Sequence, residues 1–318
     1  MKIGVIGAGN MGKKHIRVLS DIDEVSKILV ADIDTKEEKK LKKRFNTEFY
    51  SDYKKMILAE KPIAVNICVP TFLHFKIAKW CMEHGVNVFV EKPIASKVSE
   101  AKKLINLAKK HKVLLMVGHI ERFNPAVRKV KELIDKGEIG KIIAITARRL
   151  GGFPPQIVDV NIAVDLAIHD IDICNMLMGD TPKSVIVNSQ RNHVINRADS
   201  VEFFLKYKRA SAYIQANWIS PVKIRMLNIT GTEGYLEMNY VTQKIELYKS
   251  QYQKFKNNIG NFSDFILRFS NPDKVVISVD EKEPLREELD YFIHSVKNKK
   301  RIDSKYALDA LVIASHAE

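Results

Sequence analysis

Short apolar runs alternate with helix-like segments through the first 120 residues of this 318-residue chain. The runs are apolar throughout, without a polar face, and they cover Lys2–Ile6, Ile28–Ile33, Ala64–Val69, Val86–Val90 and Leu114–Gly118. The helical patterns between them cover Lys13–Ser20, Lys36–Phe45, Asp52–Glu60, Phe72–His84 and Ser96–His111. Apolar strands separated by helices predict a parallel sheet covered on both faces, in which ligands bind at the carboxyl ends of the strands.

A different pattern begins after about residue 124. Helices are expected at Pro125–Gly137, Ile162–Met178, Leu285–Lys297 and Tyr306–His316, a strand at Lys141–Arg149, and a long polar loop at 250–273. From residue 201 apolar and polar positions alternate, with the apolar ones at Val201, Phe203, Leu205, Tyr207, Ala212, Ile214, Ala216 and Trp218. A period of two with one apolar face predicts a large, mostly antiparallel sheet with helices on one side.

The first apolar run ends in a glycine-rich turn, GAGNMG at residues 7–12, which leads into a helix. In a G-x-G-x-x-G motif, Gly7 permits the tight turn, Gly9 lets the backbone approach a pyrophosphate and Gly12 lets the helix pack closely. We therefore predict a dinucleotide-binding Rossmann domain whose turn, including Asn10 and Met11, holds the cofactor. A chance glycine cluster in an ordinary strand–helix turn is the alternative.

The cofactor itself is indicated by Asp32, which stands 20 residues after Gly12 at the end of the second apolar run. A carboxylate at this position binds the ribose hydroxyls of NAD and repels the 2′-phosphate of NADP. We expect NAD, bound by an α/β protein with a Rossmann domain at residues 1–120 and a second α/β domain with an open, mostly antiparallel sheet at 121–318.

A lysine follows another of the apolar runs, in the sequence Glu91-Lys92-Pro93. Pro93 restricts Lys92 to an extended conformation, and the end of a parallel strand faces the ligand crevice. Lys92 is therefore a candidate for donating a proton or polarising a substrate oxygen. The alternative is a surface lysine at a strand end.

A second set of candidate residues comprises Asp165, His169 and Asp172, whose i, i+4, i+7 spacing places them on one helix face. A histidine takes a hydroxyl proton near neutral pH, while a carboxylate one turn away orients its ring. Oxidation of an alcohol with NAD requires such a base. A solvated helix face is the alternative; a metal site lacks a third strong ligand nearby, so no metal is expected.

The segment GHIERFNP at residues 118–125 connects the two predicted domains. Arg122 and Asn124 are candidate substrate contacts, since arginine suits phosphate or carboxylate recognition. A plain linker with Asn124 as a helix N-cap is the alternative. Arg148 and Arg149 are further candidates for phosphate contacts, although paired arginines near a strand end more often lie on the surface.

Composition narrows the class of partner. The formal net charge is +14, but the lysines are spread over helical segments. A solvated surface or an anionic small substrate is therefore favoured over nucleic acid. No apolar run reaches about 18 residues, so no membrane span is expected. Cys68, Cys81 and Cys174 have no C-x-x-C spacing and indicate a reducing cytoplasm.

Together these motifs resemble the family of glucose–fructose oxidoreductase, inositol dehydrogenase and the rhizopine-catabolism protein (Gfo/Idh/MocA), over essentially the whole chain. The motifs are the glycine turn, Val69-Pro70-Thr71 with His74, Glu91-Lys92-Pro93 and Asp165-x3-His169-x2-Asp172. The resemblance implies that Lys92 and His169 are the catalytic pair and that Asp165 assists. It also implies homodimer or homotetramer contacts through the open sheet, and cofactor contacts from Pro70, Thr71, His74, Glu91 and Lys92.

Within the family, the GHIERFNP segment resembles that of nucleotide-sugar enzymes that oxidise the 3-hydroxyl of UDP-N-acetylglucosamine to a ketone. This implies a pyridoxal-phosphate aminotransferase as a pathway neighbour, and substrate contacts from Lys92, Glu121, Arg122, Asn124, Asp165 and His169. One alternative is a dehydrogenase of a free polyol or sugar such as myo-inositol. Another is a non-catalytic NAD-binding regulator, against which the presence of both Lys92 and His169 argues.

Overall fold

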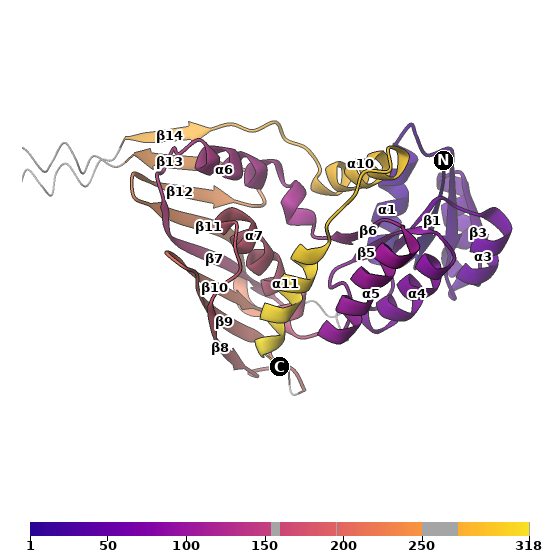
Figure 1. Ribbon diagram of the computed structural model, residues 1–318, viewed down its shortest axis with the longest axis horizontal. Coiled ribbons are helices and arrows are strands. Elements are labelled where there is room, and N and C mark those ends of the chain that lie inside the picture. Colours follow the sequence, from indigo (N-terminus) through magenta and orange to yellow (C-terminus); the bar gives the residue numbers. More distant parts are fainter. Residues whose placement is uncertain (154–159, 195, 250–272, 318) are drawn as a thin grey trace, which may run out of the picture. The chain divides into compact units, whose positions relative to one another are not determined.

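Six parallel strands form the first sheet of the computed structural model, which describes residues 1–153, 160–194, 196–249 and 273–317 (Figure 1). In spatial order they are β3 (Thr47–Tyr50), β2 (Lys27–Ala31), β1 (Lys2–Ile6), β4 (Ala64–Ile67), β5 (Asn87–Glu91) and β6 (Leu115–Gly118). The order reverses between β1 and β4, which opens the crevice in which doubly wound folds bind dinucleotides. The predicted Rossmann domain is confirmed.

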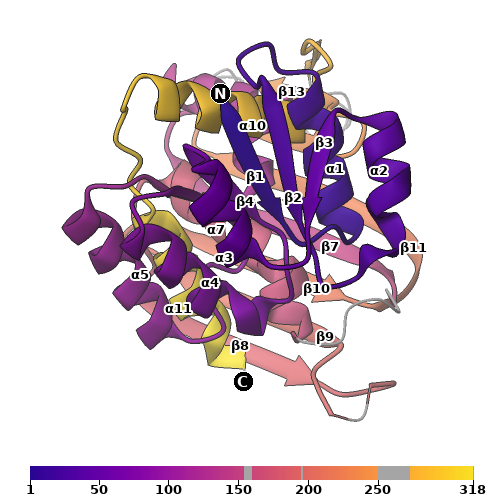
Figure 2. The same cartoon turned by 90° about the vertical axis from the view of Figure 1, so that its right-hand side faces the viewer.

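Helices connect these strands, as the sequence pattern predicts. They are α1 (Asn10–Ser20), α2 (Glu38–Arg44), α3 (Tyr53–Glu60), α4 (Thr71–Glu83) and α5 (Val98–His111), with a short 3-10 turn, η1 (Thr35–Glu37), before α2. Figure 2 shows β1, β2 and β3 side by side within this sheet. Residues of β1, β4 and β5 are almost completely buried, which explains why these strands have no polar face.

The division into compact units differs from the predicted domains in one respect. The first unit contains residues 1–120 and also 283–312, whereas the second contains 121–282 and 313–318. The C-terminal helices α10 (Pro284–Lys297) and most of α11 (Lys305–Ala314) thus belong with the Rossmann domain, and not with residues 121–282.

The packing of α10 and α11 explains this assignment. α10 packs against α1, and the ring of Phe292 meets that of Phe89 at 5.5 Å between centroids. The first turn of α11 brings the Tyr306 hydroxyl to the Val117 carbonyl oxygen, to which it donates at 2.8 Å. An amphipathic pattern predicts these helices but does not say which core they join.

The second unit contains a sheet of eight strands within its described residues. Their order is β14 (Lys274–Ile277), β13 (Ile245–Lys249), β12 (Gly234–Asn239), β11 (Ile219–Gly231), β7 (Ile142–Gly152), β10 (Ser211–Asn217), β9 (Ser200–Lys206) and β8 (Ser184–Gln190). Every neighbouring pair is antiparallel except β7 with β10. The helices α6 (Pro125–Asp135) and α7 (Ile168–Met178) lie along one face (Figure 1). The predicted open, mostly antiparallel sheet is confirmed.

Two further expectations concern segments rather than the sheets. The predicted loop at 250–273 lies outside the described residues except for its last position. Each helix that the structure describes is too short or too polar to cross a lipid bilayer.

Candidate active site

Of the three glycines in the glycine turn, Gly9 is the one at which the described residues leave room for a side chain. Gly7 has φ of +93°, and a Cβ on it would lie 2.6 Å from the Cys68 carbonyl oxygen. A Cβ on Gly12 would lie 1.9 Å from the Gly7 carbonyl oxygen, so both positions exclude a side chain. At Gly9, no atom of the described residues lies within 4 Å of a Cβ. That open space is what a pyrophosphate approaching the backbone needs.

The N-terminus of α1 gives the same site a positive electrostatic potential. Gly9 is the N-cap, and among the described residues no side chain caps the helix and no acidic residue lies in its first turn. The first N–H groups and the positive dipole end are therefore available to an anion. Asn10 and Met11, which begin the helix, are both accessible to solvent there.

Asp32 lies against this turn. One oxygen of its carboxylate accepts a hydrogen bond from the Ala8 backbone N–H, and the other accepts from the Asp34 N–H at 2.8 Å. The structure therefore brings the predicted ribose-binding carboxylate to the glycine turn, although the two are 24 residues apart.

Replacing Gly9 by alanine provides a test of this turn. Since Gly9 has φ of −69° and open space at its Cβ, the free energy of unfolding should change by less than about 0.5 kcal/mol. The Kd for NAD, measured by calorimetry, should rise at least about tenfold, because the methyl group occupies the pyrophosphate's approach. Gly12→Ala is the contrast, expected to cost about 1–3 kcal/mol or more of stability. Unchanged NAD affinity in Gly9→Ala would contradict this placement.

The end of β5 carries Lys92 beside a buried carboxylate. The Oε1 atom of Glu91 accepts from His15 Nε2 at 2.8 Å, and His15 Nδ1 lies 2.9 Å from Asn66 Nδ2. Burial alone would raise the pKa of Glu91, but the hydrogen bond from His15 and the charge of Lys92 hold that pKa below its usual value. Because His15 belongs to α1, the helix that starts at the glycine turn is tied to the strand end that carries Lys92.

His74 links two other turns at the same edge of the sheet. It is buried in α4, with Nδ1 2.8 Å from the Pro93 carbonyl oxygen and Nε2 2.9 Å from the Val69 carbonyl oxygen. It thereby joins the turn after β5 to the turn that contains Pro70 and Thr71, the N-cap and first residue of α4. Direct contact of Pro70, Thr71 and His74 with the cofactor stays a prediction.

In the second unit, Asp165 and His169 lie on consecutive helical segments. Asp165 belongs to a π-helical turn, η3 (Ala163–Ala167), and His169 is the second residue of α7. Such π-turns recur at functional sites. Asp165, His169 and Asp172 are all buried, so the alternative of a solvated helix face is wrong.

Arg122 makes a two-pronged ion pair with the third residue of that set. Its Nε atom donates to Asp172 Oδ2 at 2.6 Å and its Nη2 atom to Asp172 Oδ1 at 2.7 Å. The pattern of residues did not reveal this partner, because Arg122 and Asp172 are 50 positions apart. Asp172 therefore orients an arginine, whereas we expected it to share a polar helix face with His169.

Arg149 anchors the residue next to His169. Its guanidinium donates to both oxygens of Asp170, at 2.7 and 3.0 Å, and to Glu121 Oε1 at 2.9 Å. Burial alone would lower the pKa of Arg149, but the two carboxylates hold it above its usual value. The suggestion that Arg149 contacts a substrate phosphate is wrong, since its side chain is buried and paired on both sides.

Asn124 closes this network. Its Oδ1 atom accepts from the Ala126 N–H at 3.1 Å as the N-cap of α6, and its Nδ2 atom donates to Glu121 Oε2 at 3.1 Å. The N-cap role was the alternative raised for this residue. Two arginine–aspartate pairs and this N-cap thus hold the first half of α7 and the segment with Glu121 in place. His169, near the start of α7, is therefore held on a well-supported helix. Within the described ranges, no three metal-ligating side chains come together.

Comparisons with known proteins give the family of the chain. Residues 1–119 match the oxidoreductase family with an NAD-binding Rossmann fold, and residues 127–237 match the GFO/IDH/MocA C-terminal domain. The chain belongs to the Gfo/Idh/MocA oxidoreductase family. Members similar to it are named sugar and polyol dehydrogenases. The predictions of the family, of an NAD cofactor and of a dehydrogenase are confirmed.

Individual relatives differ in substrate. The UDP-N-acetylglucosamine 3-dehydrogenase of Acidithiobacillus ferrooxidans is 27% identical over 78% of this chain and 77% of its own. The myo-inositol 2-dehydrogenase of Thermotoga maritima is 30% identical over 59% of this chain and 58% of its own. This match covers less than two thirds of either chain. The solved structure of the Acidithiobacillus enzyme has a TM-score of 0.84 at 22% identity, covering 100% of this chain and 96% of that one. The solved structure of a levoglucosan dehydrogenase in complex with NADH has a TM-score of 0.83 at 18% identity. These structural similarities show the fold.

Proposed function

We propose that this dehydrogenase oxidises the 3-hydroxyl of UDP-N-acetylglucosamine to a ketone, with NAD as the cofactor. The observation that carries the chemistry is Lys92 at the end of β5, beside the ionised Glu91 that His15 ties to the glycine-turn helix. The choice of sugar is supported by the GHIERFNP segment and by the similarity to an enzyme named for this substrate over most of both chains. Oxidation of a polyol such as myo-inositol is the second candidate, supported by another relative.

In the proposed reaction, each group of the chain has one task. The His169 imidazole takes the hydroxyl proton, and Asp165 assists it. The Lys92 ammonium stabilises the alkoxide that develops on the sugar oxygen. Bound NAD supplies the acceptor for the hydride that leaves the sugar carbon. The proposal requires Lys92 and His169 to act on one substrate.

The substrate and cofactor contacts extend the same proposal. Glu121 and Arg122 contact the nucleotide sugar, on a segment that Arg149 and Asp172 hold in place. Asn124, also predicted as a contact, is buried and hydrogen-bonded through both atoms of its amide as the N-cap of α6, so it positions this segment instead. The cofactor contacts are those predicted from sequence at Gly7, Gly9, Asn10, Met11, Gly12, Asp32, Pro70, Thr71, His74, Glu91 and Lys92.

A substrate panel tests the proposed sugar. The protein is incubated with NAD and, separately, UDP-N-acetylglucosamine, myo-inositol or glucose, and NADH formation is followed by absorbance. A pyridoxal-phosphate aminotransferase that consumes the keto sugar is added to remove the product. We expect the highest kcat/KM with the nucleotide sugar. Turnover with myo-inositol alone would favour the second candidate, and NAD binding without any turnover would favour a regulator.

Asp32 provides a test of cofactor choice. In Asp32→Ser the carboxylate that repels a 2′-phosphate is gone, so the ratio of kcat/KM for NAD over NADP should fall by about 10²-fold. Loss of the Ala8 contact should also weaken binding of both cofactors. The exposed neighbour Asp34→Ser is the control and should keep the preference for NAD. An unchanged ratio in Asp32→Ser would exclude this role.

One face of the second sheet has exposed apolar side chains that suit contact with another copy of the chain. Ile186, Phe204 and Tyr213 lie opposite one another on β8, β9 and β10 and are 65%, 44% and 38% exposed. We propose that this face forms a homodimer or homotetramer contact, which sedimentation would reveal.

We place the reaction, with a neighbouring aminotransferase, in the cytoplasm, since Cys68, Cys81 and Cys174 are free thiols.

A further inference from the structure

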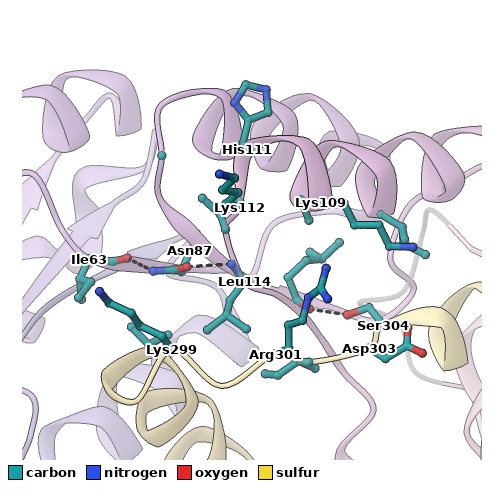
Figure 3. Close-up of a pocket in the computed structure, with 17 residues that line it drawn as sticks. Ile63, Asn87, Lys109, His111, Lys112, Leu114, Lys299, Arg301, Asp303 and Ser304 are labelled. Atoms are coloured by element: carbon teal, nitrogen blue, oxygen red, sulfur yellow. Dashed lines mark hydrogen bonds between the residues drawn. The ribbon is translucent and has the colours of Figure 1, made fainter.

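A pocket of about 1030 Å³ opens in the first unit, beside the amino ends of strands of the parallel sheet (Figure 3). Its lining includes Ile63, Asn87 and Leu114, which stand at or just before the first residues of β4, β5 and β6. Dinucleotides bind such sheets at the carboxyl ends of the strands, whereas these are the amino ends. The pocket therefore lies apart from the cofactor site.

The floor of the pocket is apolar, and its polar groups are already paired. Asn87 Nδ2 donates to the Ile63 carbonyl oxygen at 2.8 Å, and Asn87 Oδ1 accepts from the Leu114 N–H at 2.8 Å (Figure 3). The Ser304 hydroxyl donates to the Leu115 carbonyl oxygen. These bonds fix the floor and leave little polar capacity there for a ligand.

The walls of the pocket carry four cations from two distant segments. Lys109 and Lys112 lie at the end of α5, and Lys299 and Arg301 lie on the segment between α10 and α11 (Figure 3). In the part of the chain that the structure describes, none of the four has a carboxylate oxygen within 4 Å. Among the lining residues Asp303 is the one acid, which leaves a formal charge of +3 on the walls.

This arrangement differs from the usual pattern of lysines in the same protein. On its helices, lysines commonly pair with an acid four residues away, as Lys42 does with Glu38 and Lys79 with Glu83. A favourable interaction with the helix C-terminus accounts for Lys109, in the last turn of α5. It does not account for Arg301, which lies outside any helix, four residues before the start of α11.

We propose that the pocket binds a small molecule with a chain of two or more phosphates, either inorganic polyphosphate or a nucleoside polyphosphate. Lys and Arg are donors without an acceptor, so the walls match a ligand rich in anionic acceptors. The planar guanidinium of Arg301 suits a phosphate, and cations on two facing segments suit more than one anionic group. The volume is ample for a ligand of this size, since small-molecule pockets commonly measure about 300–1,000 Å³.

The test uses the full chain saturated with NAD, so that the glycine turn is occupied. Tripolyphosphate and ATP are titrated separately by calorimetry at constant ionic strength, with sulfate as a simple anion. We expect one site per chain for tripolyphosphate, no comparable binding of sulfate, and no displacement of NAD. Equal affinities for the two ligands would assign the site to the phosphate chain alone. Tighter binding of ATP would add a contact with the apolar floor; either result supports the site.

Two double variants test whether both walls contribute. Lys109→Gln with Lys112→Gln, and Lys299→Gln with Arg301→Gln, should each raise the Kd of tripolyphosphate at least about tenfold. The matched control is Lys102→Gln with Lys103→Gln, since both lysines are exposed on α5 but do not line the pocket. All three should keep the NAD affinity of the parent and a thermal midpoint within about 3 °C of it. Absence of binding, competition with NAD, or equal losses in the control would overturn the proposal.

Discussion

Replacing Lys92 by methionine is expected to lower kcat for sugar oxidation by about 10³-fold, while the Kd for NAD changes by no more than about threefold. Methionine keeps the length and apolar character of the stem but removes the ammonium that stabilises the alkoxide, a contribution typically worth about 10²–10³ in rate. Lys92 is half-buried next to the Glu91 carboxylate, so the loss also removes a partner of that anion.

The control for this variant is Lys97→Met. Lys97 follows the same strand end but is exposed, so its kcat should stay within about twofold of the parent. Lys92→Arg keeps the charge with a different geometry and should retain more activity than the methionine variant. A methionine variant with undiminished kcat would show that Lys92 takes no part in the chemistry.

Replacing Arg149 by methionine is expected to lower the free energy of unfolding by about 3–5 kcal/mol. The change leaves the buried Asp170 and the half-buried Glu121 without the cation to which both are hydrogen-bonded. Denaturation with urea, followed by circular dichroism, measures the loss. Since Asp170 adjoins His169, any folded fraction should also have a lower kcat.

Arg148→Met is the matched control, because Arg148 is the neighbouring residue on β7 but is exposed. Its effect on the free energy of unfolding should stay within about 0.5 kcal/mol. If the two variants were equally stable, the buried network would not support the start of α7 as inferred.

The strands buried on both faces could be predicted because their residues are apolar without interruption. Two strands could not. β3 (Thr47–Tyr50) is a four-residue edge strand in which every residue is half-buried, so it has no marked hydrophobic pattern. β8 (Ser184–Gln190) is the edge of the second sheet, and most of its residues are exposed. Edge strands pair with a neighbour on one side only and bury less of their side-chain surface, so their sequences carry a weaker hydrophobic pattern.

The candidate site was partly predictable for a similar reason. Gly9, Asp32 and Lys92 stand at or within three residues of the end of an apolar run, so the rule that parallel strands bind ligands at their carboxyl ends locates them. His15 was missed and Arg149 was given the wrong role, because the importance of each comes from a partner 76 or 21 residues away. A single buried histidine or arginine has no pattern that distinguishes it from a surface residue until its partner is known.

Transfer of the sugar's C3 hydrogen tests the central claim most directly. UDP-N-acetylglucosamine carrying deuterium at C3 is incubated with the enzyme and NAD, and the nicotinamide product is examined by mass spectrometry. We expect deuterium in the NADH, together with a 3-keto sugar and a kcat below that for the unlabelled substrate if C–H cleavage limits the rate. NADH without deuterium would exclude oxidation at C3, and no NADH with the aminotransferase present would contradict the proposed substrate.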